Sequence, residues 1–76
     1  MTISIGDNIF LKSWTDVNGE TYGIARTTWE RMRHHPLKVV GISDIAVIVH
    51  EMAGKNKYTW YIPIGSILNT ENRGDQ

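Results

Sequence analysis

The chain lacks cysteine altogether in its 76 residues. This absence excludes disulfide bridges and thiolate metal ligands. A chain of this length lies near the lower limit for a self-sufficient hydrophobic core, and it has no covalent links to add stability. The fold must therefore depend on a compact single core or on association between chains.

A surplus of charge of one sign is also missing. Eight lysines and arginines balance eight aspartates and glutamates. The whole-chain balance gives no electrostatic case for binding nucleic acid or an anionic membrane. A net charge near zero lowers colloidal stability and mildly favours self-association, so a homo-oligomer remains among the expected partners.

Long apolar runs are absent as well. The longest run, residues 45–49, is far too short to cross a bilayer. The first residues, Met-Thr-Ile-Ser-Ile-Gly-Asp, have neither the basic flank nor the apolar segment of a signal peptide. We therefore expect a cytoplasmic protein that does not bind a membrane.

The clearest strand signal lies toward the end of the chain. Residues 58–62 alternate with period two, which places Trp60 on one face and Tyr61 on the opposite face. Pro63 cannot donate to a sheet ladder, so the strand should end there. Residues 64–68 then predict a turn and a short last strand.

Three further segments have strand character and are bounded by turn-forming residues: 8–13, 37–43 and 45–52. The strand at 45–52 is apolar at the centre of both faces, so we expect it to be central and covered on both sides. Residues 1–5 suit an edge strand or a lead-in. Gly54 and Asn56 predict a hairpin, because both residue types tolerate positive φ.

One helix is predicted, over residues 24–35. An apolar stripe at helical spacing marks the side that should face the core: Ile24, Ala25, Thr28, Trp29 and Met32. Thr27 and Glu30 have the spacing of a capping box, and in that case the helix is shorter, over residues 28–34. Pro36 ends the helix, because a residue before proline is disfavoured in the α region.

Residues 14–23 predict a loop or an irregular hairpin. Asn18-Gly19 is the strongest short turn signal in the chain, because both residues adopt positive φ readily. Aromatic residues stand at the two ends of this segment, and acidic residues stand in its middle.

Five short strands, one short helix and a proline corner favour a mainly β fold, a small five-stranded antiparallel barrel with one inserted α-helix. Closure of the barrel would remove exposed sheet edges. Residues 1–69 would form this single domain, and the polar residues 70–76 a flexible tail.

This order of elements resembles an SH3-like barrel. The resemblance is carried by the segment 6–11, the loop 14–23, the hairpin at Gly54 and the segment 60–67. With its inserted helix, the chain looks like the small proteins that bacteriophages and prophages encode. Signalling SH3 domains bind proline-rich peptides through a tyrosine-rich first strand and a tyrosine in the last turn. Here Ser66 occupies that turn position, so we do not expect binding of proline-rich peptides.

Candidate partner-binding residues are the aromatic and acidic side chains of the first loop and of the fourth strand: Trp14, Asp16, Glu20, Tyr22 and Tyr61. An exposed aromatic beside acidic side chains is a reasonable protein contact. The alternative is that these aromatics pack laterally over the openings of the barrel.

A local basic cluster gives a second candidate site, for nucleic acid: Arg26, Arg31, Arg33 and Lys38. With Glu30 counted, the segment carries a charge of +3 (four minus one). Basic residues next to an aromatic can bind a phosphate backbone. The reading that we favour is a solvated helix face with an Arg26–Glu30 pair and Trp29 in the core.

The chain offers little for catalysis or for a metal. It has no glycine-rich phosphate loop and no nucleophile motif. Adjacent His34 and His35 diverge around a helix, and His50 and Glu51 point to opposite faces of a strand. We therefore expect no catalytic residues, no metal site and no cofactor. The sequence favours a non-enzymatic protein-interaction module, such as a small phage-type regulator or inhibitor of a host protein, with a nucleic-acid-binding accessory domain as the alternative.

Overall fold

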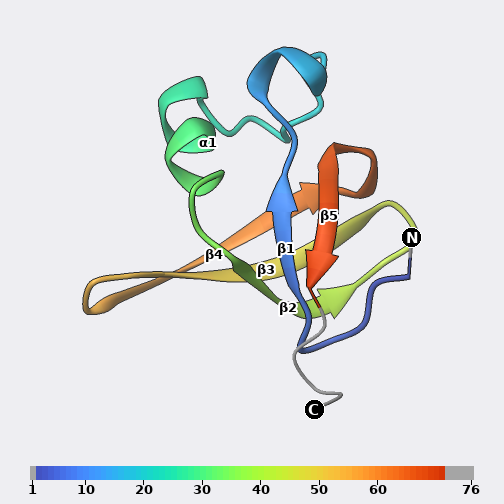
Figure 1. The fold of residues 1–76 in the computed structure, drawn as a ribbon, viewed down its shortest axis with the longest axis vertical. Coiled ribbons are helices and arrows are strands. Elements are labelled where there is room, and N and C mark those ends of the chain that lie inside the picture. Colours follow the sequence, from blue (N-terminus) through green and yellow to red (C-terminus); the bar gives the residue numbers. More distant parts are fainter. Residues whose placement is uncertain (1, 72–76) are drawn as a thin grey trace.

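The structure is a computed structural model, and it describes residues 2–71 (Figure 1). Its strands are β1 (Asn8–Leu11), β2 (Leu37–Ile42), β3 (Ala46–Ala53), β4 (Asn56–Pro63) and β5 (Ile67–Glu71). Its helices are α1 (Arg26–Met32) and the single 3₁₀ turns η1 (Trp14–Asp16) and η2 (Ile64–Ser66). No helix within the described residues is long and apolar enough to cross a membrane.

All five strands form one antiparallel sheet in the order β4-β3-β2-β1-β5. This confirms a mainly β fold with one α-helix. Strands β4 and β5 are the edges of the sheet, and they do not pair with each other within residues 2–71, so the predicted closure is not seen. In Figure 1, β1 and β5 run steeply across β3 and β4, which shows that the sheet is strongly bent.

Two irregularities in strand pairing accompany this bend. The register of β1 against β5 shifts between Phe10 and Leu11, and that of β2 against β3 shifts between Val39 and Gly41. Such bulges bend a strand and increase its twist. A Cβ added at Gly41 would lie 2.9 Å from the Cδ1 atom of Ile48, so the glycine leaves room for the side chain of the residue opposite it on β3.

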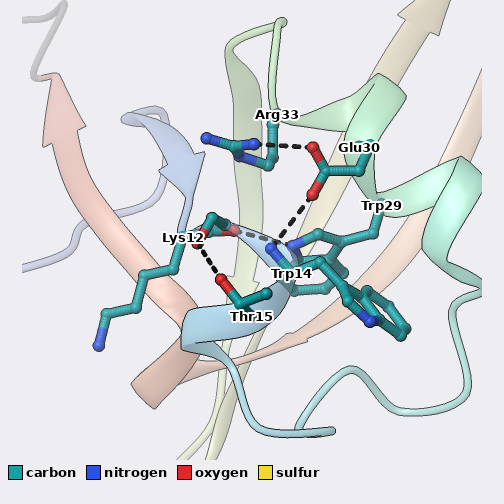
Figure 2. Close-up of polar contacts among 7 residues, drawn as sticks. Lys12, Trp14, Thr15, Trp29, Glu30 and Arg33 are labelled. Carbon is teal, nitrogen blue, oxygen red and sulfur yellow. Dashed lines mark hydrogen bonds and ion pairs between the residues drawn. The ribbon is translucent and has the colours of Figure 1, made fainter.

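The core fills the inner side of the bent sheet, beneath α1 and the first loop. Its buried members come from every strand, from the loop and from the helix: Ile9, Leu11, Val17, Ile24, Trp29, Met32, Leu37, Val39, Val47, Val49, Ile62 and Ile67. Trp29 is fully buried, which confirms that it belongs to the core. Its Nε1–H donates to the carbonyl oxygen of Lys12 at 2.8 Å (Figure 2), so the indole links the helix to the end of β1.

Strand β3 is central, as predicted, but only one of its faces is fully covered. Val47 and Val49 are buried on the inner face, whereas Ile48 is partly exposed on the outer face and Met52 is 64% exposed. The helix and the first loop both contribute to the core on the inner face, so neither covers the outer one. Ile45 lies outside β3 and is 70% exposed, because the chain is still turning there.

Helix α1 is shorter than the predicted range 24–35 and begins before the alternative range 28–34, so the capping box on which that alternative depended is wrong. Its N-cap is Ala25, which makes no side-chain hydrogen bond, and Thr27 lies inside the helix. The Glu30 carboxylate does not turn back to the helix start, because it accepts hydrogen bonds from the Trp14 amide and from Arg33. A long-range contact has replaced a local one.

The turns follow the sequence signals closely, with one exception. The β3–β4 hairpin has a two-residue turn at Gly54-Lys55, and Gly54 has φ +64°. Asn56 lies within β4 and does not adopt positive φ, so its predicted turn role is wrong. Pro63 ends β4 and η2 follows directly, as predicted.

The start of the domain matches one of the two predicted alternatives, whereas its end differs from the prediction. Residues 2–5 form no strand, although Ile3 packs against the core, so this segment is a lead-in. At the other end, Thr70 and Glu71 belong to β5, which places them in the sheet instead of in a tail. The rest of the predicted tail, 72–76, lies outside the described residues.

Candidate functional site

The first loop, residues 14–23, makes a tight turn in its middle, at the predicted place. The Glu20 amide donates to the Val17 carbonyl at 2.9 Å. The two residues between them, Asn18 and Gly19, have φ of +51° and +81°. Positive φ at both central positions is typical of a type I′ turn, for which Asn-Gly is the preferred pair.

A second turn of the same kind follows at once. The Ile24 amide donates to the Thr21 carbonyl at 3.1 Å, and Tyr22 and Gly23 between them have φ of +52° and +81°. A bulky residue with positive φ is a backbone outlier, and such outliers cluster at functional sites. The Tyr22 side chain is 52% exposed. The fold thus holds an aromatic side chain at the surface on a strained backbone.

A buried serine ties this loop to the 3₁₀ turn η2. Ser66 is fully buried, and its hydroxyl donates to the Glu20 carbonyl at 2.6 Å. Its own carbonyl accepts from the Lys12 amide at 3.0 Å. Ser66 therefore has a structural role: its two hydrogen bonds fix the first loop against the corner that follows Pro63.

A surface groove of about 660 Å³ lies between the first loop, the β2–β3 turn and η2. We call it the first-loop groove. It is lined by Gly19, Glu20, Tyr22, Gly23, Ile45, Pro63, Ile64 and Gly65. Glu20 is the charged side chain of this lining, and Tyr22, Ile45 and Ile64 give it a mainly apolar character. The Ile64 amide donates to the Ile45 carbonyl at 3.1 Å, which joins two of its walls.

The five predicted partner-binding residues do not form one site. Glu20 and Tyr22 line the first-loop groove. Trp14 and Asp16 lie on η1, where Trp14 packs partly against the core and Asp16 is exposed. Tyr61 lies on β4 and is 58% exposed, but it does not line the groove.

The contacts of Trp14 fix η1 against α1 (Figure 2). The Trp14 amide donates to Glu30 Oε2 at 3.1 Å, and Arg33 Nη1 lies 2.7 Å from Glu30 Oε1. The pKa of Glu30 is lowered below its ordinary value, mainly by the hydrogen bond from Arg33. Desolvation of the carboxylate acts in the opposite direction, whereas the hydrogen bond from the Trp14 amide and the charges of Arg33 and Arg26 lower the pKa further. The expected Arg26–Glu30 pair is replaced by Glu30–Arg33.

Arg31, a second arginine of the basic cluster, also forms an ion pair with a glutamate. Arg31 Nη2 lies 2.8 Å from Oε1 of Glu51, a side chain that is only 1% exposed. The Trp60 indole N–H donates to the same oxygen at 3.0 Å, while Glu51 Oε2 is buried without a hydrogen-bond partner. With Glu30 and Glu51 both counted, the cluster carries +2 (four minus two) instead of +3.

The remaining members of the basic cluster are exposed. Arg26 begins α1, and Lys38 lies on β2 beside His50 of β3. His34 and His35 are exposed in the turn that follows α1, whereas His50 lies on β3. Within residues 2–71, no group of three histidine or carboxylate side chains is arranged to hold a metal ion.

Comparison with protein-family models, with curated proteins and with solved structures finds no match to this chain. Its function must therefore be argued from the groove, the charges and the exposed side chains.

Proposed function

We propose that this protein is a non-enzymatic protein-interaction module that binds a partner through the first-loop groove. The observation that carries the proposal is the groove itself, a hollow of about 660 Å³ with apolar walls and one acidic side chain. Hollows lined by apolar and aromatic side chains with few polar groups are typical of binding sites. The strained backbone of Tyr22 adds support, because the fold maintains an energetically costly conformation at the rim.

The groove suits an extended segment of a partner protein. Tyr22 and Ile64 offer apolar surface for a side chain, and Glu20 favours a cationic group beside it. Tyrosine is also enriched among the residues that dominate binding energies. A small regulator or inhibitor of a host protein, of the kind that bacteriophages encode, would act through such a site.

We further propose that the fold is an SH3-like barrel. The support is the strand order β4-β3-β2-β1-β5, the long loop between β1 and β2 with its inserted helix, and the 3₁₀ turn before the last strand. The strong bend of the sheet is in keeping with this arrangement (Figure 1).

Protein binding is better supported than nucleic-acid binding. Two of the four basic residues, Arg31 and Arg33, form ion pairs with glutamates of the same chain. A phosphate ligand would have to compete with those carboxylates. Trp29, the aromatic that would have stacked on a base, is fully buried.

A pull-down from lysate of the native host, with matched variants, tests the proposal. Tyr22→Asn removes the aromatic ring but keeps a residue that tolerates positive φ, so the loop should retain its turn. Leu68→Asn makes the same change in polarity at an exposed residue of β5, outside the groove. A specific partner protein should be recovered by the wild type and by Leu68→Asn and lost with Tyr22→Asn.

Nuclease treatment and a second variant separate the two functions. Arg26→Glu with Lys38→Glu reverses two exposed charges without breaking the ion pairs of Arg31 and Arg33. Protein binding through the groove should survive both this variant and the nuclease. Recovery of nucleic acid that is lost with the charge reversal would refute the groove and favour the basic cluster.

A further inference from the structure

Strand β4 presents one open edge of the sheet, because β3 is the only strand that pairs with it in the described part of the chain. The register shows which backbone groups face that edge. The Ile64 amide donates to the Ile45 carbonyl, and these two residues continue the β3–β4 register one step beyond its last pair, Ala46 and Pro63. Hydrogen-bonded pairs recur every second residue in an antiparallel ladder. The N–H and C=O groups of Lys57, Thr59 and Tyr61 therefore point away from β3.

We propose that this edge pairs with β4 of a second copy of the chain, antiparallel and centred on Thr59. A two-fold axis through the Thr59 pair relates the two strands, so the same surface of both copies forms the interface, as in an isologous dimer. Lys57 then lies opposite the partner's Tyr61, and Thr59 lies opposite the partner's Thr59. Six backbone hydrogen bonds join the strands, two for each of three residue pairs.

The side chains of β4 complement themselves in this register. On the outer face, the Lys57 ammonium lies over the ring of the partner's Tyr61, a cation–π arrangement. On the inner face, Tyr58 lies opposite the partner's Trp60, and aromatic pairs directly opposite each other stabilise antiparallel strands. Tyr58 and Tyr61 are 41% and 58% exposed in the single chain, so both rings are accessible.

The neighbouring registers fit less well. A two-fold centred on Tyr58 sets Tyr61 against Lys55, which lies in the hairpin turn. A two-fold centred on Trp60 sets Lys57 against Pro63, which has no N–H to donate. The Thr59 register alone pairs all three outward-facing residues with one another.

Charge and accessibility favour a second copy as the occupant. The chain has no net charge at neutral pH, so two copies do not repel each other as a whole. Tyr61 does not line the first-loop groove, so the dimer leaves that site open. Pairing through a single strand buries less than the area of a standard interface, about 1,200–2,000 Å², so a weak dimer is expected.

Sedimentation equilibrium over about 10 µM to about 1 mM tests the proposal, because weak dimers populate in this range. The wild-type mass should rise from 8.7 kDa toward twice that value. Tyr61→Lys sets two lysines opposite each other and should hold the protein at the monomer mass. Adding Lys57→Glu to Tyr61→Lys restores opposite charges and should recover the dimer. Leu68→Lys, on the opposite edge strand, should dimerise like the wild type.

A wild-type protein that remains monomeric at the highest concentration would overturn the proposal. So would a Tyr61→Lys variant that still dimerises, or a double variant that does not recover the dimer. Lys57→Glu alone probes the same contact from the other side and should weaken the dimer at least several-fold. It serves as the deciding variant if circular dichroism shows Tyr61→Lys to be unfolded.

Discussion

The substitution Trp29→Phe tests how α1 is attached to the sheet. Trp29 is fully buried, and its Nε1–H donates to the Lys12 carbonyl at 2.8 Å. Phenylalanine has no N–H, so the carbonyl is left without that partner, at a cost of about 1–3 kcal/mol for a buried group. Because the bond is only partly buried, the lower half of that range applies, and the cavity left by the smaller ring adds about 1 kcal/mol.

The expected loss is therefore about 2–3 kcal/mol. A domain of this length has a total stability of about 4–11 kcal/mol, so the variant should fold with a melting temperature lowered by about 8–24 °C. Urea denaturation followed by far-ultraviolet circular dichroism measures the free energy of unfolding without depending on tryptophan fluorescence.

Trp14→Phe is the matched control for this measurement. Trp14 is only partly buried, and its hydrogen bond to Glu30 comes from the backbone, which phenylalanine retains. Its loss should stay below about 1 kcal/mol. If Trp29→Phe costs no more than Trp14→Phe, then Trp29 is not the anchor of the helix, and a surface role beside the basic cluster regains support.

Three further predictions concern stability. Glu51→Ala deprives the partly buried Trp60 indole of its acceptor and should cost about 1–3 kcal/mol in urea denaturation, with a smaller loss for Glu51→Gln, which keeps an acceptor oxygen. The folded-state pKa of Glu30 is lowered chiefly by the hydrogen bond from Arg33. The ionised carboxylate therefore stabilises the fold above the unfolded-state pKa of about 4.3, and this stabilisation is lost as the pH falls through the lower folded-state pKa. The difference in the free energy of unfolding between wild type and Glu30→Gln should shrink over that acidic range and stay constant above about pH 6. Gly41→Ala should change the free energy of unfolding by less than about 1 kcal/mol, because the added Cβ meets only the Cδ1 end of the partly exposed Ile48 side chain, which can turn away, and alanine loses less backbone entropy than glycine in a strand. A larger loss in urea denaturation would show that Ile48 cannot move.

Local patterns predicted the elements of this fold well. The alternation in residues 58–62 predicts that Trp60 and Tyr61 lie on opposite faces, and in the structure Trp60 is partly buried while Tyr61 is exposed. The Asn18-Gly19 turn, the corner after Pro63 and the buried Trp29 also follow from short-range preferences. Each of these signals lies within a few residues, where backbone geometry and periodicity decide the outcome.

Long-range contacts could not be predicted in the same way. The capping-box spacing of Thr27 and Glu30 was misleading, because an amide 16 residues away takes the carboxylate. Burial of Glu51 depends on Arg31, which is 20 residues distant, and on Trp60 across a strand pair. The sequence shows that Glu51 shares a strand face with apolar residues, but it does not show which side chains would bind the carboxylate there.

The first-loop groove itself was not predicted, for the same reason, although two of the candidate partner-binding residues line it. The acidic and aromatic character of the loop pointed to Glu20 and Tyr22, and both line the groove. Its other wall, with Ile45 and Ile64, comes from segments far along the chain. The bond from Ser66 that holds the loop spans 46 residues, a separation at which periodicity carries no information.

The most direct test of the groove as the binding site is an amide chemical-shift titration of the isotope-labelled protein with a peptide selected on it from a random library. The groove account predicts that the largest shifts fall on residues 19–24 and 64–65, and that Tyr22→Asn abolishes them while Leu68→Asn does not. Shifts confined to α1 and Lys38, with the first loop unchanged, would contradict it.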